Sequence, residues 1–243
     1  MGNRGGCENH GVNRTLRILS TALITAGLVV LADAGLTLVW QEPVSAAYGS
    51  LKQGQARDDL DHLEADYPTS EDLAAVSGVA ENAELARILA DRFEDRIKDG
   101  DAIGRIDIDR IGLNAVFLQG TDTGTLQHGP GHYLKTSLPG QPGTVGIAGH
   151  RTTYLAPFRH IDEIENGDEI RLEMPYAAFT YEVTRHEIVE PEDVKILRPI
   201  GHDQVVLTAC HPLYSAAQRW AVFAKLTRID TFAITGEGSW PAP

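Results

Sequence analysis

The chain has 243 residues, which is enough for one substantial folded domain with additional segments. Its 34 acidic side chains outnumber its 21 lysines and arginines, and the net charge of −13 argues against a nucleic-acid-binding protein, because phosphate binding requires basic surfaces. No glycine-rich phosphate loop, CxxC pair or HExxH motif occurs, so the sequence indicates neither a nucleotide cofactor nor a metal site.

The N-terminal part of the chain has the pattern of a membrane anchor. Residues 1–17 are polar and contain three arginines, and residues 18–40 form a predominantly apolar run that ends at Trp40. A helix over this run would be about 34 Å long, which is enough to cross a hydrocarbon core of about 30 Å. The arginines before the run predict a cytoplasmic N-terminus, so the residues after position 40 should lie outside the cytoplasm.

A cleaved signal peptide is the alternative interpretation of this apolar run. Val44-Ser45-Ala46 resembles a cleavage site, but the run is long for a signal peptide. We therefore expect an uncleaved signal anchor that spans the plasma membrane once, at residues 18–40.

Residues 41–100 have the composition of an acidic helical linker. Between Arg57 and Asp99 there are 13 acidic and 5 basic side chains, a local charge near −8. Pro68-Thr69-Ser70-Glu71 is a helix-capping signal. Helical spacing of largely apolar side chains follows at Leu85, Ile88, Leu89, Arg92, Phe93 and Ile97. The linker either packs on the domain that follows it or forms a solvated stalk.

From Asp101 the pattern changes to short strands. Isoleucine, leucine, valine and phenylalanine recur in short segments between residues 103 and 117. Further strand-like runs are Thr144–Ala148, Glu169–Met174, Phe179–Val189, Gln204–Ala209 and Trp220–Arg228. Several short strands with little helix predict a mainly β domain over residues 101–230, either an antiparallel barrel or a sandwich. We expect residues 231–243 to be a disordered tail.

Cys210 stands where one of these strands ends. His211-Pro212 cannot readily continue the strand, because proline has no N–H for the ladder. If the chain turns back into the run that begins near Trp220, the hairpin brings Cys210 close to Arg219. A guanidinium beside a thiol favours the thiolate and can also bind an oxyanion. The structural alternative is an inert buried cysteine next to a solvated arginine. Cys7 lies on the other side of the predicted span, so it offers Cys210 no disulfide partner.

His150 is the best-placed histidine to serve this thiol. A cysteine nucleophile usually needs an imidazole to activate it and to protonate the leaving group. The run from Gly143 to Gly149 predicts a strand that ends in a glycine, so His150 should stand at a strand end, as Cys210 does. His211 is adjacent to Cys210, but neighbouring residues of an extended chain point to opposite sides. It could line the site but is poorly aimed as the partner of the thiol.

These residues resemble the sortase family over roughly residues 101–228. The motifs are Gly146-Ile-Ala-Gly-His150-Arg-Thr-Thr, Phe158-Arg-His-Ile-Asp, Asn166-Gly-Asp-Glu-Ile170 and Leu207-Thr-Ala-Cys210-His-Pro, then Arg219, with Gly120-Thr-Asp-Thr and Gly129-Pro-Gly-His-Tyr133 upstream. The anchor and the acidic linker resemble those of actinobacterial sortases of classes E and F. One departure is Ala209, because the family commonly has Thr-Leu-x-Thr before the nucleophile, and alanine removes the hydroxyl.

The resemblance implies a closed eight-stranded β-barrel and a transpeptidase that needs no cofactor. Its substrates would be secreted proteins with a C-terminal LPxTG-like or LAxTG-like signal, and its acceptor an amine of a cell-wall precursor or a pilin. Cys210 would form a thioester with the threonine carbonyl, His150 would transfer protons, and Arg219 would hold the substrate or the oxyanion. We expect the substrate groove to include Thr121, His132, Thr152, Tyr154, His211 and Tyr214.

Two other functions remain compatible with these residues. A hydrolytic cysteine peptidase on the same scaffold would share every one of them. A membrane-anchored binding domain, in which Cys210 is structural, would carry out no chemistry. The acidic run Asp162, Glu163 and Glu165 could bind calcium, although a solvated acidic loop is the simpler interpretation.

Overall fold

The computed structural model describes residues 9–39 and 43–231. The chain divides into two units, Met1–Pro43 and Val44–Pro243. In the first unit, helix α1 (Asn9–Val39) contains a 22-residue stretch, Arg14–Gly35, that is long and apolar enough to cross a membrane, as an N-terminal signal sequence would also be. Trp40, where we expected the span to end, and all but Thr231 of the expected C-terminal tail lie outside the described residues.

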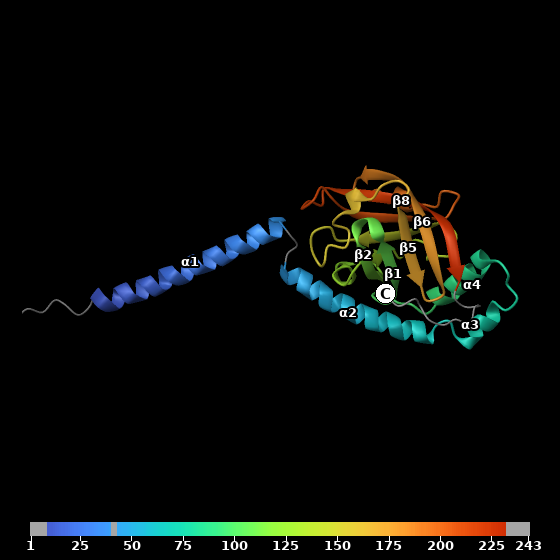
Figure 1. Ribbon diagram of the computed structural model, residues 1–243, viewed down its shortest axis with the longest axis horizontal. Coiled ribbons are helices and arrows are strands. Elements are labelled where there is room, and N and C mark those ends of the chain that lie inside the picture. The colour runs from blue at the N-terminus through green and yellow to red at the C-terminus, as the bar shows by residue number, and fades with distance from the viewer. Residues whose placement is uncertain (1–8, 40–42, 232–243) are drawn as a thin grey trace, which may run out of the picture. The chain divides into compact units, whose positions relative to one another are not determined.

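The second unit contains a closed barrel of eight strands, as the family resemblance implied (Figure 1). Around the barrel the strands follow the order β1-β2-β3-β4-β7-β8-β6-β5. Their bounds are β1 Ala102–Ile108, β2 Leu113–Gln119, β3 Gly131–His132, β4 Thr144–Gly149, β5 Glu169–Met174, β6 Ala177–Val189, β7 Gln204–His211 and β8 Gln218–Thr231. Short helices lie in the connections: η1 Asp109–Ile111, α5 Thr123–Leu126, η2 Ile161–Glu163 and η3 Val194–Leu197.

Alternation along β7 separates the two faces of this strand. Val205, Leu207 and Ala209 belong to the main core inside the barrel. Val206 instead packs on the outer side, against Ile196 and Leu197 of η3. Successive side chains of a strand point to opposite faces, so Thr208 and Cys210 share the outer face with Val206.

Three helices precede the barrel and belong to the same compact unit: α2 (Pro43–Asp66), α3 (Ser70–Ala75) and α4 (Asn82–Glu94). The amphipathic helix α4 places Leu85, Leu89 and Phe93 in the main core, where each is fully buried. The Phe93 ring lies 5.5 Å from that of Tyr176, the residue directly before β6. This helix therefore packs on the barrel. The prediction of a solvated stalk is wrong for the part of the linker that forms α4.

Helix α2 runs along the β1–β2 side of the barrel (Figure 1). Leu60 packs against Ala102 and Val116. The buried Gln53 amide donates to the Val116 carbonyl at 2.9 Å and accepts from the Val116 N–H at 2.9 Å. A single side chain thus pairs both the N–H and the C=O of Val116, and leaving these buried backbone groups unpaired would be costly.

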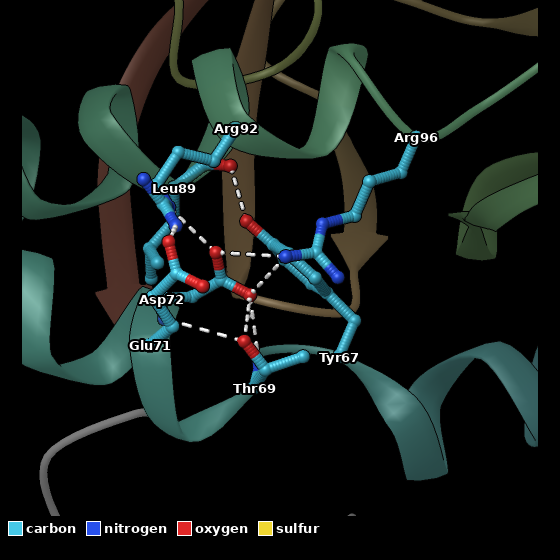
Figure 2. A network of polar contacts seen from close by, with 7 residues as sticks. All are labelled: Tyr67, Thr69, Glu71, Asp72, Leu89, Arg92 and Arg96. Atoms are coloured by element: carbon cyan, nitrogen blue, oxygen red, sulfur yellow. Dashed lines mark hydrogen bonds and ion pairs between the residues drawn. The ribbon is translucent and has the colours of Figure 1, made fainter.

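A polar network joins α3 to α4 (Figure 2). Thr69 and Asp72 form a capping box at the start of α3, as the sequence signal predicted. Asp72 is fully buried and binds Arg92 Nε at 2.5 Å and Arg96 Nη2 at 2.9 Å. The Tyr67 hydroxyl donates to the Leu89 carbonyl at 2.5 Å. These contacts hold the two helices together where α4 enters the core.

Candidate active site

Cys210 and Arg219 lie directly opposite each other on the antiparallel strands β7 and β8. Directly opposed residues of a ladder share one face, so both side chains are on the outer face of the barrel. Both are half-buried. Arg219 Nη1 donates to the Ala216 and Gln218 carbonyls, each at 3.0 Å. The guanidinium has three further N–H groups, on Nε and Nη2, that are not used by these two bonds.

His150 follows β4, which runs parallel to β7. Their ladder ends at the pair Gly149–Ala209, so His150 and Cys210 are the next residues of two adjacent strands. Val145 and Ile147 of β4 point into the core, and alternation then places His150 on the outer face with Cys210. A side chain at Gly149 is excluded, because its Cβ would lie 2.5 Å from the ring of Phe158.

The environment of His150 disfavours the charged form of its imidazole. Burial lowers the pKa of His150 below its ordinary value of 6.5. Its Nε2 is buried and has no hydrogen-bond partner among the residues that the structure describes. The ring stacks at a tilt against Tyr154, with centroids 5.2 Å apart. A neutral ring with an unpaired buried nitrogen can exchange a proton with a thiol or an amine.

An apolar cavity of about 550 Å³ lies on the same side of the barrel. It connects to the thiol face through Tyr133, whose hydroxyl is 2.9 Å from Oγ1 of Thr208, two residues before Cys210. The side chains that line the cavity come from the β2–α5 connection, the β3–β4 loop and η3 with its flank: Thr121, Tyr133, Leu134, Lys135, Thr136, Val194, Leu197, Arg198 and Pro199. Of the residues expected in the substrate groove, Thr121 is thus placed in a cavity.

His132 is placed differently from our expectation. Its side chain is 1% exposed, with Nδ1 2.8 Å from Oε1 of Gln119 and Nε2 3.0 Å from the Ser137 carbonyl. Burial lowers its pKa to about 4. The ring therefore holds the β2–β3–β4 connection together. Its enclosed position contradicts our expectation that His132 contacts the substrate directly.

His211 also lies away from the thiol. It points to the face of β7 opposite Cys210 and packs on Trp220, with ring centroids 5.4 Å apart. Ala209 is on this inner face as well, in register with Trp220. The small side chain of Ala209 thus lies in the core beside the Trp220 indole. A threonine here would point to the same inner face, so the alanine removes no hydroxyl from the face that carries the thiol.

The other expected groove residues lie in two loops. Thr152 and Tyr154 follow β4 and are half-buried, while Tyr214 in the β7–β8 turn is 49% exposed. Tyr154 has φ = 50° and Tyr214 has φ = 65°, both in the left-handed region. Arg159 donates to the Tyr214 hydroxyl at 3.3 Å, which links the two loops beside His150 and Cys210.

Sequence reasoning missed Arg151 as a site residue. Its side chain is only 4% exposed. Nη1 is 3.4 Å from the Cys210 carbonyl and 3.3 Å from His211 Nδ1, and Nη2 is 2.6 Å from Asp162 Oδ2. An arginine directly after a strand-end histidine was the available signal, because alternation turns such a side chain inward.

Each carboxylate of the acidic run in the loop after β4 has its own side-chain partner. Asp162 binds Arg151, Glu163 binds His160 Nδ1 at 2.7 Å, and Glu165 binds Arg110. These carboxylates point to different partners rather than to one another. Among the described residues no group of three metal-ligating side chains occurs.

Comparisons with known proteins agree with this geometry. The sequence model of the sortase domain matches residues 106–227. Sortase D of Bacillus subtilis is 28% identical over 214 residues, covering 86% of this chain and 98% of that protein. Sortase SrtE2 of Streptomyces coelicolor is 27% identical and covers 89% of this chain and 84% of that protein.

Solved structures give the same result. A Clostridium perfringens sortase D5 transpeptidase superposes with a TM-score of 0.57 and 28% identity, covering 71% of this chain and 98% of that one. Sortase E from Streptomyces avermitilis has a TM-score of 0.52 and 32% identity, covering 56% and 93%. Class D relatives thus stand beside the class E relatives that the sequence motifs suggested.

Proposed function

The chain belongs to the sortase family of cysteine transpeptidases, and from this we propose that it cleaves an LPxTG-like or LAxTG-like sorting signal between threonine and glycine. The acyl group then passes through a thioester on Cys210 to an amine of a cell-wall precursor or a pilin. One observation supports this most: Cys210 faces Arg219 in register, and His150 leaves the adjacent parallel strand on the same face.

Acylation uses the three side chains in distinct roles. His150 accepts the proton of the Cys210 thiol, and the sulfur attacks the threonine carbonyl carbon. The N–H groups of Arg219 face the oxygen that becomes negatively charged. The carbon–nitrogen bond breaks, and His150 returns the proton to the amine of the departing glycine.

Deacylation reverses these roles. His150 takes a proton from the incoming amine, whose nitrogen attacks the thioester carbon. The carbon–sulfur bond breaks, and the proton returns to the sulfur of Cys210. If water replaces the amine, the same steps hydrolyse the signal, so transfer and hydrolysis differ only in the acceptor.

The apolar cavity binds the first part of the signal. Its walls at Leu134, Val194 and Leu197 suit the leucine that opens both motifs, and Thr121 at its edge is available for a backbone contact. Because the relatives include classes D and E, both LPxTG and LAxTG are substrates to test.

We propose that the N-terminal segments anchor this chemistry at the plasma membrane, which the apolar stretch of α1 supports. Residues 1–17 are cytoplasmic, residues 18–40 span the membrane, and the linker 41–100 with the barrel 101–230 lies outside. A tether at the outer face raises the effective concentration of enzyme near substrates held in the same membrane.

The test uses the full chain in detergent micelles. It is incubated with LPxTG and LAxTG reporter peptides, with and without an added amine, and Cys210 is examined by mass spectrometry. We expect a thioester that passes to the amine and that is absent in Cys210→Ala and in His150→Ala. An adduct lost only to water would favour the hydrolytic peptidase. No adduct, with Cys210 resistant to alkylation in the folded protein, would overturn the catalytic function and leave a structural cysteine.

A further inference from the structure

The β4–β7 ladder stops one residue short of both reactive side chains. Its last pair is Gly149–Ala209, whereas the β7–β8 ladder continues past Cys210 to His211–Gln218. Backbone pairing therefore fixes Cys210 relative to Arg219. It does not extend to His150, so another contact must hold the end of β4 against the end of β7.

The guanidinium of Arg151 lies in this gap. Beyond its contacts with the Cys210 carbonyl and with His211 Nδ1, Nε is 3.3 Å from the Arg159 carbonyl. Arg151 thus connects its own strand end to the end of β7 and to the loop after β4. Its Nη2 reaches Asp162 in η2, so each nitrogen of the planar fork has a partner.

Asp162 orients the Arg151 guanidinium. A nearly buried cation is costly unless it is paired, and Asp162 is the carboxylate that pairs with it at 2.6 Å. Asp162 is itself 43% exposed, so it is held at the surface while the arginine extends inward. Lysine could supply the charge but not the several fixed contacts of the fork.

We infer that Arg151, oriented by Asp162, is a positioning residue that sets the separation and orientation of the His150 imidazole relative to the Cys210 thiol. It acts from the inner side of β7, opposite the thiol, and touches neither substrate nor reacting atoms. This inference rests on the proposed function, because it assigns Arg151 a role in the same reaction.

The inference predicts a loss in kcat rather than in KM. A misplacement of about 1 Å between reacting groups can cost about 100-fold in rate. We expect Arg151→Gln to lower the acylation kcat by about 10- to 100-fold while KM changes by less than about threefold, because the cavity is on the other face. Arg151→Lys should recover only part of the rate, and Asp162→Asn should lose less than Arg151→Gln.

Arg105 offers a matched control. It is also an arginine of low exposure, at 21%, held by the carboxylates of Asp61 and Glu64. It lies on β1 against α2, away from Cys210. Arg105→Gln should lower the melting temperature and leave kcat unchanged. If Arg151→Gln lowers kcat no more than Arg105→Gln does, the positioning role is overturned and Arg151 is merely structural.

Two measurements keep the test decisive. If Arg151→Gln does not fold, Asp162→Asn replaces it, because a half-exposed carboxylate can be changed without loss of the core; an unchanged kcat there overturns the inference. The rate of Cys210 alkylation is also followed against pH, without any peptide. A pH profile of alkylation that is altered in Arg151→Gln or Asp162→Asn, but not in Arg105→Gln, supports the inference. It does so even if no reporter peptide is cleaved, and that combination of results would overturn only the proposed substrate.

Discussion

Cys210 and Arg219 are directly opposed residues of the β7–β8 ladder, and this pairing puts a thiol and a guanidinium on one face of the barrel. The turn between the strands joins them within one hairpin. A slip of one residue in this register would move Arg219 to the inner face, because side chains alternate along a strand. The register is held by the core residues on the same strands, so packing within the barrel protects the arrangement of the site.

Replacing Arg219 should remove transition-state stabilisation without unfolding the protein. Within the described part of the chain its two hydrogen bonds are to the carbonyls of Ala216 and Gln218, close to it in sequence, so Arg219→Gln leaves the core intact. Loss of one oxyanion contact typically costs about 100- to 1000-fold in kcat. Arg228→Gln, an exposed arginine on the same strand, is the control and should have wild-type rates. Equal rates for the two variants in a peptide transfer assay would contradict the role of Arg219.

The pH dependence of acylation should reflect the lowered pKa of His150. Burial disfavours the charged ring, so the imidazole stays neutral until the pH falls below 6.5, the ordinary pKa of histidine. As a base it is active only when neutral, and the acid limb of the rate profile should therefore lie below pH 6.5. Single-turnover thioester formation measured from pH 4 to 8 checks this. An acid limb above the ordinary histidine value would show that burial does not control this ring.

Asp72 should stabilise the fold in a pH-dependent way. Burial alone would raise its pKa, but hydrogen bonds from Thr69 and Arg92 and the charge of Arg96 outweigh burial and lower the pKa from 3.8 to about 2. A pKa lowered by folding means stability that is present above the unfolded value and is lost as the pH falls through the folded value. We expect Asp72→Asn to lower the free energy of unfolding by about 2–3 kcal/mol at pH 7.

Urea unfolding of the full chain measures this difference, which should shrink as the pH falls from about 4 toward 2. Glu71→Gln is a matched control, because Glu71 also binds Arg92 but is 84% exposed. Exposed ion pairs contribute at most about 1 kcal/mol, so this variant should unfold almost as the wild type does. A loss in Glu71→Gln equal to that in Asp72→Asn would contradict the importance of the buried carboxylate.

The first turns of α2 should influence the loop that carries Tyr154. The Tyr154 N–H donates to Ser45 Oγ at 3.3 Å, and the rings of Tyr48 and Tyr154 lie 6.2 Å apart. A Cβ at Gly49 would lie 3.0 Å from the Tyr154 carbonyl carbon and 3.2 Å from the Leu155 nitrogen. Gly49→Ala should therefore press on a segment whose residues 154–156 all have positive φ, and shift Tyr154 against His150.

We expect Gly49→Ala to lower kcat severalfold in the peptide transfer assay. Gly54 is the matched control, because it lies in the same helix and a Cβ there would meet no atom of the described residues within 4 Å. Gly54→Ala should keep wild-type rates and gain about 0.5–1 kcal/mol of stability from its helix propensity. A wild-type rate in Gly49→Ala would show that the loop accommodates the methyl group without disturbing the site.

Much of this protein follows from patterns between near neighbours in the sequence. The apolar run, the strand alternation, the capping signal at Thr69 and the strand-end positions of His150 and Cys210 are all local, since each depends on residues a few positions apart. The barrel required the family motifs in addition, because alternation alone does not distinguish a barrel from a sandwich.

The remaining features depend on what covers each residue in the folded chain. Only the tertiary structure shows that His132 is enclosed, that α4 supplies part of the core, and that Arg151 contacts the Cys210 carbonyl while it pairs with Asp162. Burial and pairing of this kind join segments far apart in the sequence. A histidine or an arginine has the same local signal whether it faces a groove or the interior, and long-range packing decides between the two.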